Sequence, residues 1–129
     1  MKKKKIKILL IEDEPSLNKI IKLKLEETGC LVDSVFTAEE GLEVLKNYPP
    51  DLIWLDIYLP GMSGLEFLKK IRKDPLTADQ KVIIVSVSVS NKKIELAEEL
   101  RAIDYLVKSN YTIEELVTKV VGTLKEGRK

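Results

Sequence analysis

The stretch DLIWLDIYLPGMSG, residues 51–64, combines a short apolar run with a following turn. Four consecutive apolar residues in it lead directly to Asp56, and the pair Pro60-Gly61 follows shortly afterwards. A short continuous apolar run that ends in turn residues is typical of a strand buried on both faces. Strands of that kind belong to parallel sheets that carry helices on both sides. The stretch therefore predicts one central strand of an α/β domain.

Further apolar runs and helix-start signals extend this pattern along the chain. Four more runs stand at residues 6–11, 31–35, 81–87 and 104–107. The segments between the runs carry apolar residues at helical spacing. Three pairs fit the capping box: Thr37 with Glu40, Ser63 with Glu66, and Thr112 with Glu115. Pro15 and Gly29 fit the start and the end of the first helix. This alternation predicts an α/β fold with a doubly wound five-stranded parallel sheet, (βα)5.

The bulk composition limits the class of protein. The chain has 129 residues, of which 44% are hydrophobic, and this is enough for one domain with a real core. We expect a single domain over residues 1–129, with its core at about 6–124. The 22 basic and 21 acidic residues give a net charge of +1, so we expect no direct contact with nucleic acid. The basic run at residues 2–5 is interpreted as a solvated lead-in to the first strand.

The sequence also excludes several kinds of site. It contains no histidine, which rules out histidine-ligated metals and Ser-His-Asp catalysis. The lone Cys30 cannot form an internal disulfide, so nothing indicates an oxidising compartment. No run approaches the ~18 apolar residues of a membrane span. We therefore expect a cytoplasmic protein without a membrane partner.

Polar side chains follow four of the five expected strands. Glu12 and Asp13 follow the first strand, Asp56 the third, Ser86 the fourth and Lys108 the fifth. Because ligands of doubly wound sheets bind at the carboxyl ends of the strands, we expect these groups to converge on one edge. Each residue alone also fits ordinary helix-start, turn or surface polarity. Their combination at matching strand ends favours a functional site.

These residue types point to phosphoryl transfer. Clustered carboxylates repel one another unless a cation lies among them. Hard oxygen ligands select Mg²⁺ or Ca²⁺, and Mg²⁺ suits a site with few protein oxygens because it takes the rest from water and phosphate. Asp56 can then act as a carboxylate nucleophile, as in aspartyl-phosphate chemistry. Lys108 and the Ser86 hydroxyl can hold the phosphoryl oxygens in the transition state.

At residues 8–14, 51–64, 82–86 and 104–108 the sequence resembles the receiver domains of two-component response regulators. The resemblance extends from residue 6 to about residue 124. It implies the flavodoxin-like strand order 2-1-3-4-5 of the chemotaxis receivers. It also implies a phosphoacceptor signalling domain rather than a conventional enzyme. Such a domain catalyses its own phosphorylation and dephosphorylation, here at Asp56.

The resemblance implies roles for individual residues. Asp56 is similar to the phosphoacceptor of the family. Glu12 and Asp13 are similar to the acidic pair that binds Mg²⁺, with Asp56 and the backbone carbonyl of Tyr58 as further ligands. Lys108 is similar to the lysine that bridges to the phosphoryl oxygens.

The resemblance further implies a switch and partners. The Ser86 hydroxyl would turn toward the phosphoryl group, and the Tyr105 ring would move inward with it. The phosphoryl donor would be a phosphohistidine on a sensor histidine kinase or a phosphotransfer protein, while the downstream target stays unknown. A homodimer would use the face formed by the fourth helix, fifth strand and fifth helix, at about residues 92–124. No output region follows Leu124, so we expect either a stand-alone receiver or a part of a longer protein.

Three residues depart from the family pattern. Ser109 stands where a proline usually follows the lysine, and we expect a trans Lys108-Ser109 bond because a non-proline cis bond costs about 2.5–4 kcal/mol. Arg101 stands where the family usually has glycine. Val87 stands where the family has alanine or glycine, and its stiff β-branched side chain is expected to slow access to Asp56.

Two other functions stay open at this point. A phosphatase of the haloacid dehalogenase type also places a nucleophilic aspartate after a parallel strand. It typically has a second aspartate two positions on, where this sequence has Tyr58. A phosphorylation-independent interaction module on the same fold would bind neither Mg²⁺ nor a phosphoryl mimic. The acidic pair, Asp56, Ser86 and Lys108 argue against that module.

Overall fold

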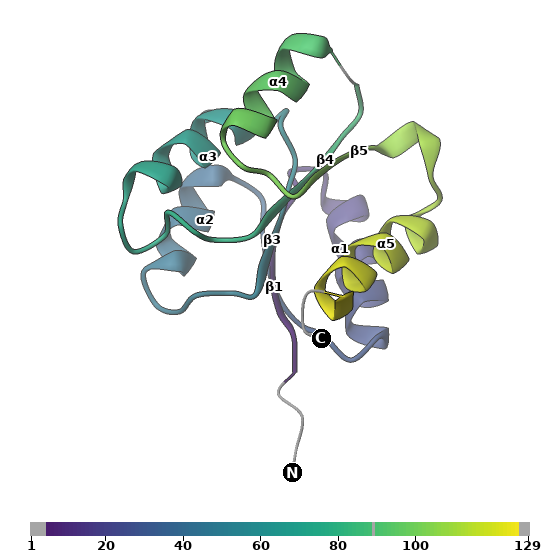
Figure 1. Cartoon of the computed structure of the whole chain (residues 1–129). Coiled ribbons are helices and arrows are strands. Elements are labelled where there is room, and N and C mark those ends of the chain that lie inside the picture. Colours follow the sequence, from purple (N-terminus) through teal and green to yellow (C-terminus); the bar gives the residue numbers. More distant parts are fainter. Residues whose placement is uncertain (1–4, 89, 127–129) are drawn as a thin grey trace.

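A computed structural model describes residues 5–88 and 90–126 of the chain (Figure 1). It contains one sheet of five parallel strands in the order β2-β1-β3-β4-β5. The strands are β1 (Lys7–Ile11), β2 (Leu31–Val35), β3 (Leu52–Leu55), β4 (Val82–Ser86) and β5 (Asp104–Val107). The predicted fold class and strand order are confirmed. The basic run at residues 2–5 lies outside the described residues except for Lys5, which is exposed.

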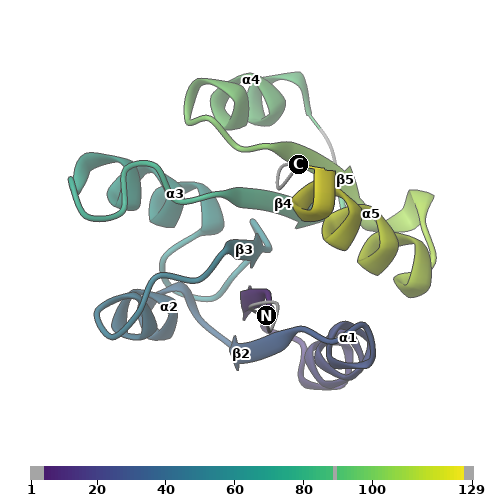
Figure 2. The ribbon, with the colours of Figure 1, turned by 60° about the horizontal axis from the view of Figure 1, so that its bottom comes forward.

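Helices cover both faces of the sheet. Helices α1 and α5 lie on one side of it, and α2, α3 and α4 lie on the other (Figures 1 and 2). Their bounds are α1 (Pro15–Glu27), α2 (Ala38–Leu45), α3 (Gly64–Lys73), α4 (Asn91–Glu99) and α5 (Ile113–Glu126). A short 3₁₀ helix, Lys108–Asn110, joins β5 to α5. Because both faces are covered, the central strands β3 and β4 are buried along their whole length, whereas the edge strands β2 and β5 are partly exposed.

Side chains cap the helices largely where the sequence predicts. Thr37 and Ser63 accept hydrogen bonds from the backbone of α2 and α3. Thr112 and Glu115 form the full reciprocal box before α5, with bonds of 2.8 and 3.1 Å. Two caps were not predicted: Glu14 accepts bonds at the start of α1, and Ser90 accepts one at the start of α4. The Glu14 carboxylate thus caps the helix, while the Glu14 backbone N–H donates to Glu12 Oε2 at 3.0 Å.

The residues just before the strand ends are fixed in two buried layers. Leu10 and Trp54 belong to the cluster that the sheet forms with α1 and α5. Ile11 and Leu55 belong to the cluster on the side of α2, α3 and α4. All four side chains are completely buried. Burial of one such side chain contributes about 1.5–3 kcal/mol, so the strand ends that carry the polar residues are rigidly placed.

Arg101 adopts the backbone conformation that favours the glycine usual in the family. Its φ is +60°, in the left-handed region. The chain reverses there after α4, with hydrogen bonds from Arg101 N to Glu98 O and from Ala102 N to Ala97 O, both 2.9 Å. The side chain of Arg72 donates to the carbonyl oxygens of Leu100 and Arg101. These bonds help to hold a non-glycine residue in a conformation that costs about 1–2 kcal/mol.

Candidate functional site

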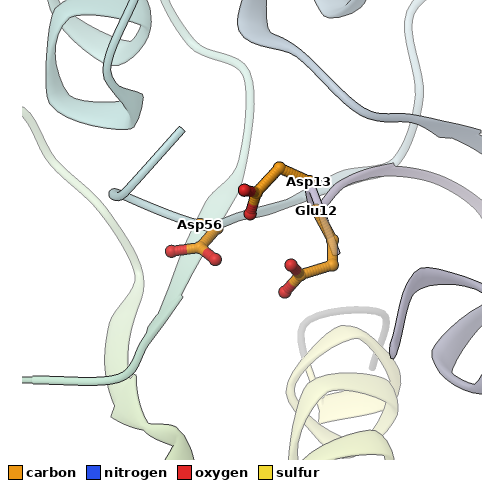
Figure 3. A group of neighbouring side chains, drawn as sticks. All are labelled: Glu12, Asp13 and Asp56. Carbon is orange, nitrogen blue, oxygen red and sulfur yellow. The ribbon is translucent and has the colours of Figure 1, made fainter. Parts of the chain in front are cut away.

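Three carboxylates converge at the carboxyl edge of the sheet. Glu12 and Asp13 follow β1, and Asp56 follows the neighbouring strand β3. One oxygen from each carboxylate lies within 4.8 Å of the others, and the side chains share one region (Figure 3). Glu12 and Asp56 are buried, whereas Asp13 is exposed to solvent. Oxygen ligands in this number fit Mg²⁺, which retains several of its own waters.

Lys108 pairs with two of these carboxylates. Its Nζ lies 2.5 Å from Glu12 Oε1 and 2.9 Å from Asp56 Oδ2. Burial opposes the charge on Lys108, but hydrogen bonds to Glu12 and Asp56 outweigh burial and raise the pKa of the ammonium. Burial also raises the pKa of Glu12, although the bond from Lys108 opposes that shift. The ammonium therefore links the acidic pair to the predicted nucleophile.

The peptide bond after Lys108 is trans, as predicted. Residues 108–110 form the 3₁₀ helix instead of a cis-proline turn. The Tyr111 backbone N–H closes this turn by donating to Lys108 O at 3.3 Å. Lys108 still reaches both carboxylates from this altered loop. The replacement of proline by Ser109 thus changes the backbone without removing the lysine from the site.

The loop after β3 orients Asp56 through backbone contacts. Tyr58 N donates to Asp56 Oδ1 at 3.1 Å, while Lys108 occupies the other oxygen. Gly64, the first residue of α3, lies directly against the Asp56 backbone. A Cβ atom at this position would be 2.1 Å from Asp56 O, so only glycine fits. Gly64 N also donates to Ile57 O at 2.9 Å, which closes the loop.

Ser86 and Tyr105 lie on β4 and β5, and no hydrogen bond among the described residues joins either of them to Asp56. Ser86 ends β4 and is completely buried. Within the described residues, no hydrogen bond of ordinary geometry reaches its hydroxyl. Tyr105 instead donates to the backbone oxygen of Ser88 at 3.0 Å. Burial raises the pKa of Tyr105, and the nearby Ser86 hydroxyl opposes that shift. The exposed Val87 follows Ser86, and its effect on access stays a prediction.

Asn18 supports the acidic pair and was not anticipated from the sequence. Its amide is buried in α1 and donates to Glu12 O at 2.9 Å and to Val35 O at 3.1 Å. It therefore ties the end of β1 to the end of β2. The available signal was a polar residue next to the apolar stripe of the first helix, which does not by itself identify a partner.

The hydrogen bonds of the Tyr58 hydroxyl were also not predicted from the sequence. The Tyr58 hydroxyl bonds to Ser88 Oγ at 2.8 Å and accepts a hydrogen bond from Lys93. The Lys93 ammonium also lies 4.2 Å from the centre of the Tyr58 ring. The bond from Lys93 lowers the pKa of Tyr58. Nothing in the sequence indicated that α4 would reach the residue two positions after Asp56.

The fold and the site together define the class of protein. It is a flavodoxin-like α/β domain with an acidic pocket and a paired lysine at the carboxyl edge of its sheet. The sequence model of the response regulator receiver domain matches residues 8–121. The chain therefore belongs to the response regulator receiver domain family, the phosphoacceptor class of two-component signalling.

Curated relatives support this membership. The chain is 35% identical to the probable C4-dicarboxylate response regulator DctR of Halalkalibacterium halodurans over 113 residues, which are 86% of this chain and 48% of that protein. It is 34% identical to the response regulator ArlR of Staphylococcus saprophyticus over 119 residues, which are 92% of this chain and 52% of that protein. The chain spans about half the length of these relatives.

Solved structures agree with the fold. A CheY-like response regulator receiver domain protein from Methanospirillum hungatei superposes with a TM-score of 0.86 at 30% identity, over 95% of this chain and 96% of that one. A putative response regulator from Chloroflexus aurantiacus gives a TM-score of 0.83 at 27% identity, over 95% and 99% of the two chains. Among the described residues, no helix is both long and apolar enough to cross a bilayer.

Proposed function

We propose that Asp56 accepts a phosphoryl group from a phosphohistidine on a sensor histidine kinase or phosphotransfer protein, in a Mg²⁺-dependent step. A carboxylate oxygen of Asp56 attacks phosphorus, the bond from phosphorus to the donor nitrogen breaks, and the histidine leaves with the electron pair. The observation that carries this proposal is the ion pair of 2.9 Å between Lys108 and a buried Asp56, with the acidic pair beside it.

The proposed metal ligands are the carboxylates of Glu12, Asp13 and Asp56 and the backbone carbonyl of Tyr58. Bound Mg²⁺ supplies positive charge to the phosphoryl oxygens. Tyr58 N holds one Asp56 oxygen at 3.1 Å. Lys108 is already paired with Asp56, and its ammonium would stabilise the negative charge that develops on the phosphoryl oxygens. The same residues would support dephosphorylation by water, so the domain would catalyse both steps at Asp56.

Ser86 and Tyr105 are the proposed switch. A phosphoryl group adds up to ~2 negative charges and strong acceptor oxygens. The buried Ser86 hydroxyl, which lacks an ordinary hydrogen bond within the described residues, can donate to one of these oxygens. Tyr105 then repacks beside it, and the face formed by α4, β5 and α5 changes. We propose that this face contacts the downstream target or a second copy of the chain.

We propose that residues 1–129 form one receiver domain and that it works in the cytoplasm. The relatives are about twice as long, so an output function of a whole protein is itself a proposal. The names of some relatives describe them as transcriptional regulatory proteins. A receiver of this kind would act on nucleic acid only through an attached or separate partner.

Intact-mass spectrometry tests the assignment. Incubation with Mg²⁺ and phosphoramidate should add one acid-labile phosphoryl group, and a chelator should prevent it. Asp56→Asn should abolish labelling because an amide of the same shape is a far poorer nucleophile. Asp79→Asn, in an exposed loop, is the matched control and should label normally. Labelling of the Asp56→Asn protein would sink the assignment, and turnover of p-nitrophenyl phosphate would favour a phosphatase.

A further inference from the structure

A hydrogen bond from the side chain of Glu39 on helix α2 reaches the loop between β3 and α3. This loop, residues 57–63, directly follows Asp56 and contains Tyr58, whose carbonyl is a proposed metal ligand. Its two ends are joined by the bond from Gly64 N to Ile57 O. Its middle donates from Met62 N to Glu39 Oε2 at 3.1 Å. The position of the loop therefore depends on a carboxylate from a different element.

Helix α2 is a firm support for Glu39. Thr37 caps the helix, and Ala38 at its start is completely buried. Gly41 lets the helix approach β1 closely, since a Cβ atom there would lie 2.6 Å from the Cδ1 atom of Ile11. Glu39 lies between these two anchors on the first turn. The backbone of Glu39 is therefore held close to β1, and its exposed side chain reaches the loop from there.

Gly61 shows how closely the carboxylate fits the loop. Gly61 has a φ of +72°, which favours glycine. A Cβ atom at Gly61 would also lie 2.7 Å from Glu39 Oε2. The Glu39 carboxylate therefore packs against the loop backbone in addition to bonding Met62. Among the described residues, the group of carboxylates that could hold an ion contains Glu12, Asp13 and Asp56, and Glu39 is outside it.

We propose that Glu39 is a positioning residue for the metal site. It fixes the loop that carries the Tyr58 carbonyl, so that less ordering is required when Mg²⁺ binds, and it does this without touching the ion. This inference rests on the proposed function, because it assigns a role relative to that Mg²⁺ site. The role belongs to the hydrogen-bond acceptor on Glu39, and its negative charge is not required.

Three variants of the whole chain separate these contributions. Glu39→Ala removes the acceptor and the charge, whereas Glu39→Gln keeps an oxygen that can accept from Met62 N. Glu43→Ala is the matched control, because Glu43 lies one turn further along α2, is exposed and pairs with Lys46 instead of the loop. Mg²⁺ is titrated into each protein without a phosphoryl donor, and binding is followed by backbone amide shifts in NMR spectra.

We expect Glu39→Ala to weaken Mg²⁺ binding about fivefold, the effect of losing one ordinary hydrogen bond. Glu39→Gln and Glu43→Ala should stay within about twofold of the parent. The Met62 amide resonance should shift upfield in Glu39→Ala alone, and labelling by phosphoramidate at saturating Mg²⁺ should keep its rate. An unchanged Mg²⁺ affinity in Glu39→Ala overturns the proposal. So does an equal loss in Glu39→Gln, which would assign the effect to charge.

Failure of the role of Glu39 and failure of the proposed function would give different results. If the parent protein binds no Mg²⁺ and takes no label, the proposed function fails before any variant is compared. If the parent binds Mg²⁺ and labels at Asp56 while Glu39→Ala titrates like the parent, only the role of Glu39 fails.

Discussion

The two halves of the candidate site differ in how well their polar groups are paired. In the charged half, Glu12 and Asp56 are buried and share the ammonium of Lys108, at 2.5 and 2.9 Å. In the hydroxyl half, formed by Ser86, Ser88, Tyr58, Tyr105 and Lys93, the buried Ser86 hydroxyl has no ordinary hydrogen bond from the described residues. The remaining contacts of that half lie near the surface.

This difference matches the two tasks of a receiver. Chemistry benefits from charged groups that are already in place, because ordering them then costs nothing at the moment of transfer. A switch needs groups that can change partners at low cost. Under the proposed function, the charged half would serve the first task, and the hydroxyl half has the loose pairing that the second would require.

Removal of Lys108 should have the largest effect. Lys108→Ala leaves two buried carboxylates without their cation, and breaking a buried ion pair in this way costs about 3 kcal/mol. The free energy of unfolding, measured with urea, should fall by that amount in a chelator and recover in part with Mg²⁺. Phosphorylation-dependent signalling should be lost even if some labelling persists.

The exposed pair of Lys24 and Glu114 provides the control for Lys108. Its atoms are 3.7 Å apart at the surface, so Lys24→Ala should cost less than about 1 kcal/mol. Equal losses of stability in Lys24→Ala and Lys108→Ala would mean that the charged half is not electrostatically special.

Gly64→Ala should disturb the charged half through the backbone. A Cβ atom would lie 2.1 Å from Asp56 O, so the start of α3 or the Asp56 backbone must move. Forced overpacking of this kind costs about 2 kcal/mol, and labelling of Asp56 should slow. Gly122→Ala in α5 is the matched control, because a Cβ atom there has no neighbour within 4 Å. That variant should gain up to about 1 kcal/mol from helix propensity. A Gly64→Ala protein that is as stable as the parent would contradict the close contact.

Ser86→Ala tests the loose pairing of the hydroxyl half. Replacing a buried hydroxyl that lacks a good partner removes a desolvation cost, so the unphosphorylated protein should become more stable by about 1 kcal/mol. The Tyr105 resonances should then stop responding to beryllofluoride with Mg²⁺. Ser86→Thr keeps the hydroxyl and should keep the response. A clear loss of stability in Ser86→Ala would show that the hydroxyl is well bonded before phosphorylation.

The sequence predicted the sheet and the charged half because both follow from local pattern. Most of the strands are continuous apolar runs, and parallel strands bring their carboxyl ends to one edge. The proximity of Asp56 and Lys108 could therefore be predicted without knowing the shape of the loops. The trans bond at Ser109 was predictable from the energy of the peptide bond alone. Arg101 adopts the positive φ that glycine usually supplies at this position of the family, because the turn after α4 requires that conformation.

The parts that could not be predicted depend on how loops pack against distant elements. Asn18 bonds a carbonyl 17 residues away, Glu39 reaches 23 residues along the chain to Met62, and Lys93 reaches 35 residues back to Tyr58. Each is a polar residue on a helix, where a solvated side chain is the ordinary expectation. Only the relative placement of helix and loop gives such a residue a partner, and hydrophobic periodicity carries no information about that placement.

The bond between Lys93 and Tyr58 is an exposed contact of the hydroxyl half. The bond lowers the pKa of Tyr58 below its ordinary value of 10.0. A group with a lowered acidic pKa adds stability above its unfolded pKa, and that stability is lost as the pH falls through the folded pKa. The contact should therefore be weak near neutral pH and strengthen toward pH 10.0.

Lys93→Met should move the tyrosinate absorbance of Tyr58, identified by subtraction of a Tyr58→Phe spectrum, to higher pH. Lys92→Met, which alters the exposed neighbour on α4, should leave it unchanged. Identical titration curves for the Lys93→Met protein and the parent would remove Lys93 from the hydroxyl half and leave Ser88 as the remaining partner of Tyr58.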